Sequence, residues 1–186
     1  MIKFILNVKY LYITFCAISC ITLNAQAPIV KSSGDIFEDL EKLKVLGSIL
    51  YVAAHPDDEN TRLISYYANE VKARTAYLSL TRGDGGQNLI GPEIKELLGV
   101  MRTEELMAAR RIDGGEQMFS RANDFGYSKN AEETREIWEE EKVMSDVVWA
   151  IRKYRPDVIV NRFDHTSSGK THGHHTASAI LSYEAF

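Results

Sequence analysis

Residues 48–59 read SILYVAAHPDDE, an apolar run followed at once by a histidine, a proline and three carboxylates. An apolar run without alternation is typical of a strand buried on both faces, the kind found in parallel sheets. Two further runs, at 75–81 and 157–161, have the same character, and 116–120 is a weaker candidate. These runs predict a buried sheet that is covered on both faces.

Helical patterns separate the predicted strands. Apolar residues recur at helical spacing in segments 59–71, 93–113 and 133–154, and Asn130 with Glu133 predicts a capping box before the last of them. Strands that alternate with helices need crossover connections, which favour parallel neighbours. We therefore expect an α/β fold, a three-layer αβα sandwich with a mainly parallel sheet. Ligands of such sheets gather at the carboxyl ends of the strands.

The first 27 residues predict a secretory signal peptide, and therefore export to the periplasm or the exterior. Two lysines precede an uncharged stretch at 10–23, and the small-residue segment Ala25-Gln26-Ala27 follows it. The apolar run of about 14 residues is shorter than the ~20 that a helix needs to cross a bilayer, so we expect no membrane span in the mature chain. Residues 17–20 form a weak lipobox-like sequence, but apolar residues continue past Cys20, which favours cleavage over lipidation.

Composition excludes several classes of protein. Both cysteines lie within the first 27 residues, so disulfides and cysteine metal sites are excluded from the mature chain. Removing that segment takes away two lysines and no acidic residue, which changes the formal net charge from −4 to about −6. No basic footprint for nucleic acid remains.

The mature chain is long enough for one domain. We divide it into a lead-in segment at 28–47, which includes a charged helix-like stretch, and a domain at 48–186. A helix predicted from Thr176 shows no stop signal before Phe186. We therefore expect the native protein to continue and the domain to be incomplete at its C-terminal end.

The segment His55-Pro56-Asp57-Asp58-Glu59 carries the strongest chemical signal. Its three carboxylates repel one another, so their proximity costs free energy unless a cation or a helix N-terminus compensates. Asp57 or Asp58 could cap the helix predicted from Glu59, but capping explains only one carboxylate. His55 and Asp58, three residues apart across a turn, can converge on one ion, which leaves Asp57 free to act on bound water.

A second group, His172-Gly173-His174-His175, follows the strand predicted at 157–161. Such a tract can be a solvated loop, but four of the five histidines lie between residues 165 and 175, at a strand end expected to face His55. Two histidines and one carboxylate around an open position are typical of catalytic zinc, although iron or cobalt can take the same ligands. Zinc polarises a carbonyl and lowers the pKa of water to near ~7, and Asp57 would act as general base and then general acid.

These residues resemble the signature of a known family, the PIG-L or LmbE-like zinc-dependent N-acetylglucosaminyl deacetylases. The hexapeptide AHPDDE at 54–59 looks like the first motif of the family, and His172 with His175 resembles the second. The segment 98–109 is similar to the middle helix of the family. The resemblance covers roughly residues 48–186, and the hexapeptide is specific.

The resemblance implies a Rossmann-like fold and removal of an N-acetyl group from an N-acetylglucosamine-type amino sugar or conjugate, with release of acetate. The expected partner is therefore a small-molecule amino sugar. The resemblance further implies that His55, Asp58 and His175 bind zinc and that Asp57 is the catalytic base. It assigns His172 to stabilising the oxyanion or relaying a proton.

One departure from the family pattern concerns the residues between the two motif histidines. The family often carries Pro-Asp there, whereas this chain has Gly173 and His174. An aspartate at position 174 would help to hold the neighbouring His172 charged. A histidine there could instead lower the pKa of His172 or compete as a metal ligand. The three-residue spacing favours His175 over His174 as the ligand.

Substrate contacts are expected from Arg102, Arg82 and Asp84. Arg102 could instead pair with Glu105 on the same helix face. The loop at 83–86 resembles the glycine-rich loop of the family. Read alone it is a flexible turn, because neither the Rossmann nor the P-loop spacing is met.

Other functions compete with the deacetylase interpretation. An amidase that acts on a larger N-acyl group or a thiol conjugate is close to it. A catalytically silent carbohydrate-binding domain of a larger exported protein is more distant, and the spare carboxylate of Asp57 argues against it. A dinucleotide-binding oxidoreductase is excluded because His55 stands where a glycine fingerprint would begin. The sequence leaves the exact substrate, the metal in the cell and the oligomeric state open.

Overall fold

The computed structural model describes residues 30–167 and 170–186, and the expected signal peptide at 1–27 lies outside them. The chain divides into two units, residues 1–38 and 39–186, and the second holds the sheet and the candidate site. Helix α2 (Ser33–Lys42) begins after Ser32, whose backbone and side chain bond to Asp35. Among the described residues, no helix combines the length and the apolar composition needed to cross a membrane.

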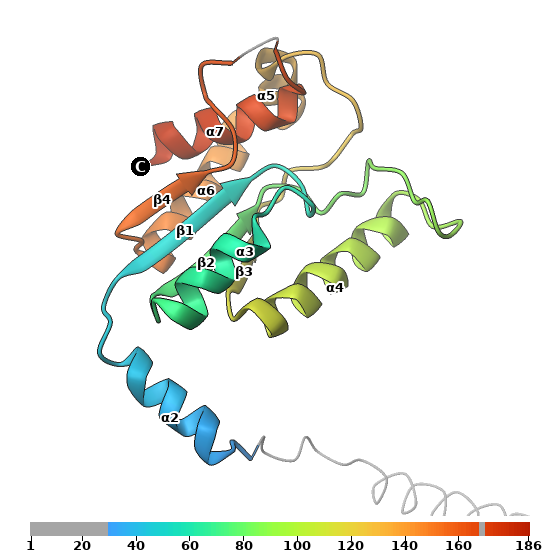
Figure 1. Cartoon of the computed structure of the whole chain (residues 1–186). Helices are drawn as coiled ribbons and strands as arrows, with labels where there is room; N and C mark the ends of the chain where they lie inside the picture. Colours follow the sequence, from blue (N-terminus) through green and yellow to red (C-terminus); the bar gives the residue numbers. More distant parts are fainter. Residues whose placement is uncertain (1–29, 168–169) are drawn as a thin grey trace, which may run out of the picture. The chain divides into compact units, whose positions relative to one another are not determined.

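The described part of the chain forms one sheet of four parallel strands. They are β1 (Ser48–Ala53), β2 (Arg74–Ser79), β3 (Glu116–Phe119) and β4 (Val158–Asn161). Their order is β3-β2-β1-β4 (Figure 1). The chain runs outward from β1 to β3 and returns to the other side of β1 for β4, so the strand order reverses between β1 and β4. Sheets of this type bind ligands at such a reversal, outside the carboxyl ends of the strands.

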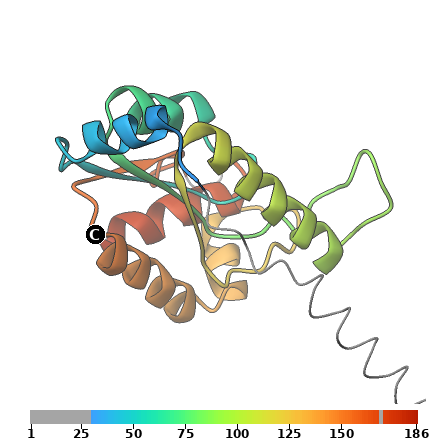
Figure 2. The same ribbon diagram turned by 90° about the horizontal axis from the view of Figure 1, so that it is seen from below.

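Helices cover both faces of the sheet (Figures 1 and 2). One face carries α3 (Thr61–Ser65), its π-helical continuation η1 (Tyr66–Glu70) and α4 (Glu96–Asp113). The other face carries α5 (Ala131–Ile137), α6 (Glu140–Tyr154) and α7 (Gly173–Ala185). The predicted three-layer α/β sandwich and its parallel sheet are confirmed.

Alternating residues of β1 show why the strand is apolar throughout. Leu50 and Val52 belong to the core cluster that includes residues of α6 and α7. Tyr51 and Ala53 point to the opposite face and pack in the cluster of Ile64 from α3. Because both faces are buried, the strand needs no polar side.

The helix after the acidic cluster begins at Thr61, two residues later than predicted. Asn60 caps it by accepting a hydrogen bond from the backbone N–H of Leu63 at 3.1 Å. Neither Asp57 nor Asp58 serves as the cap of this helix. The helix N-terminus therefore does not account for their presence.

The segment predicted as one helix at 133–154 forms two helices. Asn130 caps α5 by accepting from the N–H of Glu133 at 2.9 Å, as predicted, and the Glu133 carboxylate accepts from the N–H of Lys129 at 2.8 Å. The break lies at Trp138 and Glu139, where Glu139 adopts a φ of 51°. Trp138 is buried, and its indole N–H donates to the Asn123 carbonyl at 2.8 Å.

Candidate functional site

Segments from the carboxyl ends of β1, β2 and β3 meet the N-terminus of α7 at one hollow of about 570 Å³. The turn after β1 contributes residues 55–58, and the loop after β2 contributes Gly83 and residues 85–87. The segment after β3 contributes Asp124, Gly126 and Tyr127. His172 and His175 enter from α7. The predicted meeting of the acidic cluster with the histidine tract is confirmed.

His55, Asp58 and His175 present ligand atoms that all lie within 4.8 Å of one another. A tight turn brings the first two together, since the N–H of Asp58 donates to the His55 carbonyl at 3.2 Å. Asp58 Oδ2 lies 3.1 Å from His55 Nδ1, and Asp58 Oδ1 lies 3.6 Å from His175 Nε2. Two imidazoles and one carboxylate at this separation suit a zinc-type ion, so the residues fit the metal that the sequence implies.

Neighbouring groups fix the positions of these three side chains. The N–H of His55 donates to Asp58 Oδ2 at 2.8 Å, and the buried Tyr77 hydroxyl donates to the His55 carbonyl. The His175 ring stacks on Phe163 with a centroid distance of 3.9 Å and an interplanar angle of 6°. A ligand set held in this way loses little conformational freedom when it binds an ion.

The electrostatics of the three side chains favour a cation. Burial raises the pKa of Asp58, but hydrogen bonds and the charges of His55 and His175 outweigh it and lower the pKa overall. Burial lowers the pKa of His175, and nearby imidazoles add to that effect. Asp58 is therefore anionic and His175 neutral near pH 7, the protonation states that metal ligands need.

His55 behaves differently because it faces several carboxylates. Burial lowers its pKa, but the hydrogen bond with Asp58 and the charges of Asp58, Asp124 and Asp57 outweigh burial and raise it. A proton therefore competes with a metal ion for His55, so metal affinity falls in acid.

His172 occupies the cap position of α7 and lines the hollow. Its ring stacks between His55, at a centroid distance of 5.3 Å, and Tyr127, at 5.6 Å. Its Nδ1 lies 3.2 Å from both the backbone nitrogen and the carbonyl oxygen of Ser128, and it accepts a hydrogen bond from the Ser128 N–H. This contact uses Nδ1, so Nε2 is the nitrogen available to a ligand in the hollow.

Asp57 stands at the exposed side of the hollow, with 70% of its side chain accessible. Arg102 from α4 lies beside it, with Nη2 at 3.2 Å from Asp57 Oδ2. Arg102 Nε is also 3.3 Å from Glu105, so the pairing considered as an alternative is present as well. Arg102 lines the hollow and can meet both Asp57 and a ligand.

The structure places Arg82 and Asp84 away from the histidines, although both were expected to contact substrate. They line a neighbouring hollow of about 400 Å³. Arg82 donates to the Thr103 hydroxyl at 3.1 Å, and its guanidinium lies 4.1 Å from the centre of the Phe119 ring. Asp84 accepts a long hydrogen bond of 3.4 Å from the N–H of Asp124.

In the glycine-rich loop, Gly85 is required for steric reasons. A Cβ on Gly85 would overlap the backbone of Asp124 and Gly126 and the Asp124 carboxylate. The loop after β2 and the segment after β3 therefore touch backbone to backbone. Gly85 is needed for this close approach.

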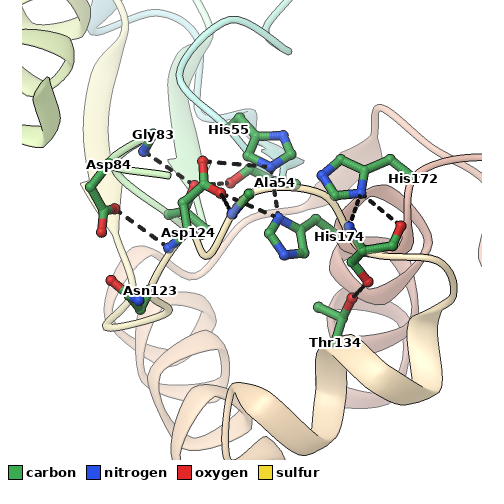
Figure 3. Close-up of polar contacts among 12 residues, drawn as sticks. Ala54, His55, Gly83, Asp84, Asn123, Asp124, Thr134, His172 and His174 are labelled. Carbon is green, nitrogen blue, oxygen red and sulfur yellow. Dashed lines mark hydrogen bonds and ion pairs between the residues drawn. The ribbon is translucent and has the colours of Figure 1, made fainter. Parts of the chain in front are cut away.

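Two residues of the site were not foreseen in these positions. His174 is fully buried, and its Nδ1 lies 2.9 Å from His55 Nε2 (Figure 3). Burial and three neighbouring imidazoles lower the pKa of His174 to about 2, so the ring is neutral. Asp124 is also buried, and its carboxylate faces both rings, at 4.0 Å from His55 and 3.8 Å from His174. The clue to Asp124 in the sequence was its place after the weak strand at 116–120.

A second set of ligand atoms, from His55, His172 and His174, also falls within 4.8 Å. His174 thus remains a possible competitor of His175, as the sequence indicated. The first set differs in having a carboxylate, Asp58, in contact with both of its imidazoles. Asp58 offsets part of the charge of a divalent ion, whereas the second set contains no carboxylate that could do so.

Solved structures share the fold. N,N'-diacetylchitobiose deacetylase from Pyrococcus horikoshii has a TM-score of 0.59 and 17% identity, over 86% of this chain and 60% of that one. The 4-carboxy-2-hydroxymuconate hydratase GalB from Pseudomonas putida has a TM-score of 0.57 and 20% identity, over 75% of this chain and 55% of that one. The chain thus spans little more than half the length of these proteins.

The sequence comparisons identify a family. No curated protein sequence matches the chain at a significant level. The family described as PIG-L: GlcNAc-PI de-N-acetylase matches residues 50–186, which contain the whole sheet after its first two residues and every side chain of the candidate site. The chain belongs to the PIG-L family.

Proposed function

We propose that this protein is a metal-dependent N-deacetylase that removes the acetyl group of an N-acetylglucosamine-type amino sugar or conjugate and releases acetate. The observation that carries the proposal is the convergence of His55, Asp58 and His175 within 4.8 Å, beside the exposed carboxylate of Asp57. The description of the family supports the same reaction.

The three converging residues would hold zinc, with iron or cobalt as ions of similar preference. When bound there, zinc supplies a Lewis acid that polarises the amide carbonyl and makes water more acidic. The carboxylate of Asp58 would offset part of its charge. The Phe163 ring and the turn at His55 would keep the ligand atoms in place.

Asp57 would act as the base. Both aspartates line the hollow, but the Asp57 side chain is 70% exposed and that of Asp58 only 12%. The Asp57 carboxylate can therefore take a proton from the attacking water and pass it to the leaving amine. Arg102 Nη2, 3.2 Å from Asp57 Oδ2, would limit the rotation of the Asp57 side chain. His172, whose Nδ1 accepts the N–H of Ser128, would present the hydrogen on Nε2 to the developing negative charge on the amide oxygen.

The wall of the hollow suits a sugar. Tyr127 is 80% exposed and lies against His172, so its face is accessible at the entrance. Flat aromatic faces pack against the apolar face of a sugar ring, and carboxylates and guanidinium groups bond to its hydroxyls. Asp124 and Arg102 line the same hollow.

We also propose that the protein is exported. The support is the order of charges, apolar residues and small residues in 1–27. Expression of the full chain followed by N-terminal sequencing tests this. We expect a product beginning near Pro28 outside the cytoplasm, and an intact Met1 in the cytoplasm would contradict it.

The reaction is tested with the purified full chain. Metal content is measured first, and acetate release is then followed with N-acetylglucosamine, its conjugates and analogues with longer N-acyl chains. We expect about one zinc per chain, acetate release, and loss of activity after chelation that added zinc restores. Faster hydrolysis of the longer acyl chains would favour the amidase alternative.

The fold alone does not separate deacetylation from hydration, because the names of its structural neighbours include both activities. The assay therefore includes 4-carboxy-2-hydroxymuconate. Consumption of this compound without acetate release from any sugar would overturn the proposal. Sugar binding without turnover would instead favour a catalytically silent domain.

A further inference from the structure

His174 is buried in an aromatic cage next to His55. Its ring is fully buried and lies 4.4 Å from the Phe125 ring and 4.9 Å from the Trp138 ring, measured between centroids. Within this cage its Nδ1 is directed at His55 Nε2, at 2.9 Å (Figure 3). At this distance one of the two nitrogens carries a hydrogen and the other accepts it.

The remaining nitrogen of His174 makes a histidine costly at this position. His174 Nε2 is buried without a hydrogen-bond partner among the described residues. A buried polar atom without a partner destabilises the fold, and an aromatic ring of similar size would fill the same cage without that cost. The contact with His55 is therefore the feature that distinguishes histidine from phenylalanine at this position.

His55 is held at both of its ring nitrogens. Nδ1 faces Asp58 Oδ2 at 3.1 Å, and Nε2 faces His174. A histidine that binds a metal through one nitrogen usually bonds through the other to a carboxylate, a carbonyl or water, which fixes the orientation of its ring. At His55 a second histidine occupies the place of that partner.

A carboxylate stands behind this pair. Asp124 Oδ1 lies 3.8 Å from His174 Nδ1, and Oδ2 lies 4.0 Å from His55 Nε2. The Asp124 side chain is only 6% exposed, and the N–H of Gly126 bonds to it at 2.9 Å. The family that this chain resembles often has an aspartate at position 174. In this chain the nearby carboxylate belongs instead to Asp124, in the segment after β3.

We propose that His174 is a positioning residue for His55 and that Asp124 supplies the negative charge that a carboxylate at position 174 would otherwise provide. His174 bonds to Nε2 of His55, so the ring cannot turn away from Asp58 and His175. The inference rests on the proposed function, because it takes His55 as a metal ligand.

Two variants of His174 separate this role from simple core packing. His174→Phe keeps an aromatic ring in the cage but removes the bond to His55. His174→Asn keeps a polar atom close to the position of Nδ1. The readouts are zinc affinity, from competition with a chelator of known affinity, and the unfolding midpoint of the metal-free full chain.

We expect His174→Phe to weaken zinc binding about 10-fold to 100-fold, the range seen when the outer partner of a ligand histidine is lost. Its metal-free unfolding midpoint should stay close to that of the native chain, because the unpaired Nε2 of His174 is gone while Nε2 of His55 loses its partner. His174→Asn should bind zinc within about 3-fold of the native chain. Equal zinc affinity for His174→Phe and the native chain would overturn the proposal.

A charge exchange tests the part assigned to Asp124. His174→Asp alone places two carboxylates close together, and their repulsion should disturb His55 and weaken zinc binding. The double variant His174→Asp with Asp124→Asn keeps one carboxylate and should bind zinc more tightly than either single variant. A double variant no better than the weaker single variant would show that the charge of Asp124 is not what position 174 needs.

These measurements also distinguish the inference from the proposed function. If the native full chain binds no zinc, the proposed function fails and His55 has no ion to hold. If the native chain binds zinc and releases acetate while the His174 variants bind zinc equally well, the proposed function stands and the positioning role of His174 is rejected.

Discussion

Asp57 and Asp58 are neighbours in the sequence, yet the turn after β1 gives them different surroundings. Asp58 is 12% exposed and lies between His55 and His175. Asp57 is 70% exposed and meets Arg102 at the open side of the hollow. A buried carboxylate among imidazoles suits a metal ligand, and an accessible one suits proton transfer. Backbone geometry thus gives two identical side chains different surroundings, each suited to one of the two proposed roles.

The different roles of the two aspartates predict the behaviour of an Asp57 variant. Asp57→Asn should lower the rate of acetate release about 10²-fold to 10⁴-fold, because the amide cannot accept the proton. Its zinc content should be unchanged, since Asp57 is not one of the three converging ligands. Glu105→Gln is the matched control, because Glu105 also contacts Arg102 but lies on α4. Loss of zinc from Asp57→Asn, or a rate equal to that of the control, would contradict the assignment.

At Gly85, the addition of a single carbon atom is expected to lower the stability of the fold. Gly85→Ala places a methyl group against the backbone of Asp124 and Gly126, which cannot move aside as a flexible side chain can. We expect a loss of about 1–3 kcal/mol in the free energy of unfolding, measured by chemical denaturation. Gly47→Ala is the control, because a Cβ there meets nothing within 4 Å. Equal stability of the two variants would show that the loop after β2 moves freely.

At the scale of the elements, both boundaries of α6 adopt backbone conformations that the sequence does not predict. Glu139 separates α5 from α6 with a φ of 51°, and Arg155 ends α6 with a φ of 56°. Glycine is the usual residue in this left-handed region, so a glutamate or an arginine gives no warning of it. The continuous helical pattern at 133–154 was therefore predicted as one helix.

The end of α6 offers a test of this strain. Arg155→Gly should raise the free energy of unfolding by roughly 0.5–1 kcal/mol, because glycine adopts the left-handed conformation without a steric penalty. The bond from its N–H to the Ile151 carbonyl, 2.7 Å long, is kept. Arg152→Gly, one turn earlier in the helical region, should instead lower stability by about 1 kcal/mol. A loss of stability in Arg155→Gly would mean that its side chain does more than end the helix.

The elements that could be predicted are those whose residues carry a local signal. β1 was found from its apolar run, and the segment from His55 to Glu59 could be placed at the carboxyl end of a parallel strand. β3 gave a weak signal because its residues are only partly buried or exposed at the edge of the sheet. The segment that follows β3 and brings in Asp124 was therefore not recognised.

Contacts between distant segments account for the other differences. Arg82 follows β2, at the sheet end where a substrate contact is expected. Its guanidinium packs on the Phe119 ring of β3, so Arg82 lines the neighbouring hollow. The sequence left His174 open as a competing ligand, with His175 preferred, but gave no sign that His174 is buried. Its burial depends on Phe125 and Trp138, which lie about 40 to 50 residues earlier.

For the whole domain, the sheet order explains where the site forms. β1 is central, and the reversal between β1 and β4 leaves room at their carboxyl ends for the turn at His55 and for the start of α7. At the opposite end of the same strand pair, hydrogen bonds join Ser48 to Asp157, and we call this contact the clamp at Ser48. Asp157, before β4, accepts hydrogen bonds of 2.8 Å from both the backbone N–H and the hydroxyl of Ser48 at the start of β1.

The clamp at Ser48 predicts how acid affects the stability of the domain. The hydroxyl of Ser48, together with its N–H, lowers the pKa of Asp157 below its ordinary value. A carboxylate whose pKa is lowered by folding stabilises the folded state fully above its ordinary pKa of about 4, and this stabilisation is lost as the pH falls through the lowered pKa. Because Ser48 and Asp157 lie 109 residues apart, the effect acts on the fold as a whole.

Asp157→Asn removes the ionisation but keeps the shape of the side chain. Its unfolding midpoint should be lower than that of the native chain near pH 7. The difference should shrink as the pH falls from about 5, where the unfolded chain begins to take up the proton, through the lowered pKa of Asp157. Thermal unfolding followed by circular dichroism across this range measures both effects. Glu70→Gln, which changes an exposed carboxylate, should follow the native chain at every pH. If the difference between Asp157→Asn and the native chain stays constant down to pH 3, the effect comes from packing. The charge of Asp157 would then not contribute to holding β1 and β4 together.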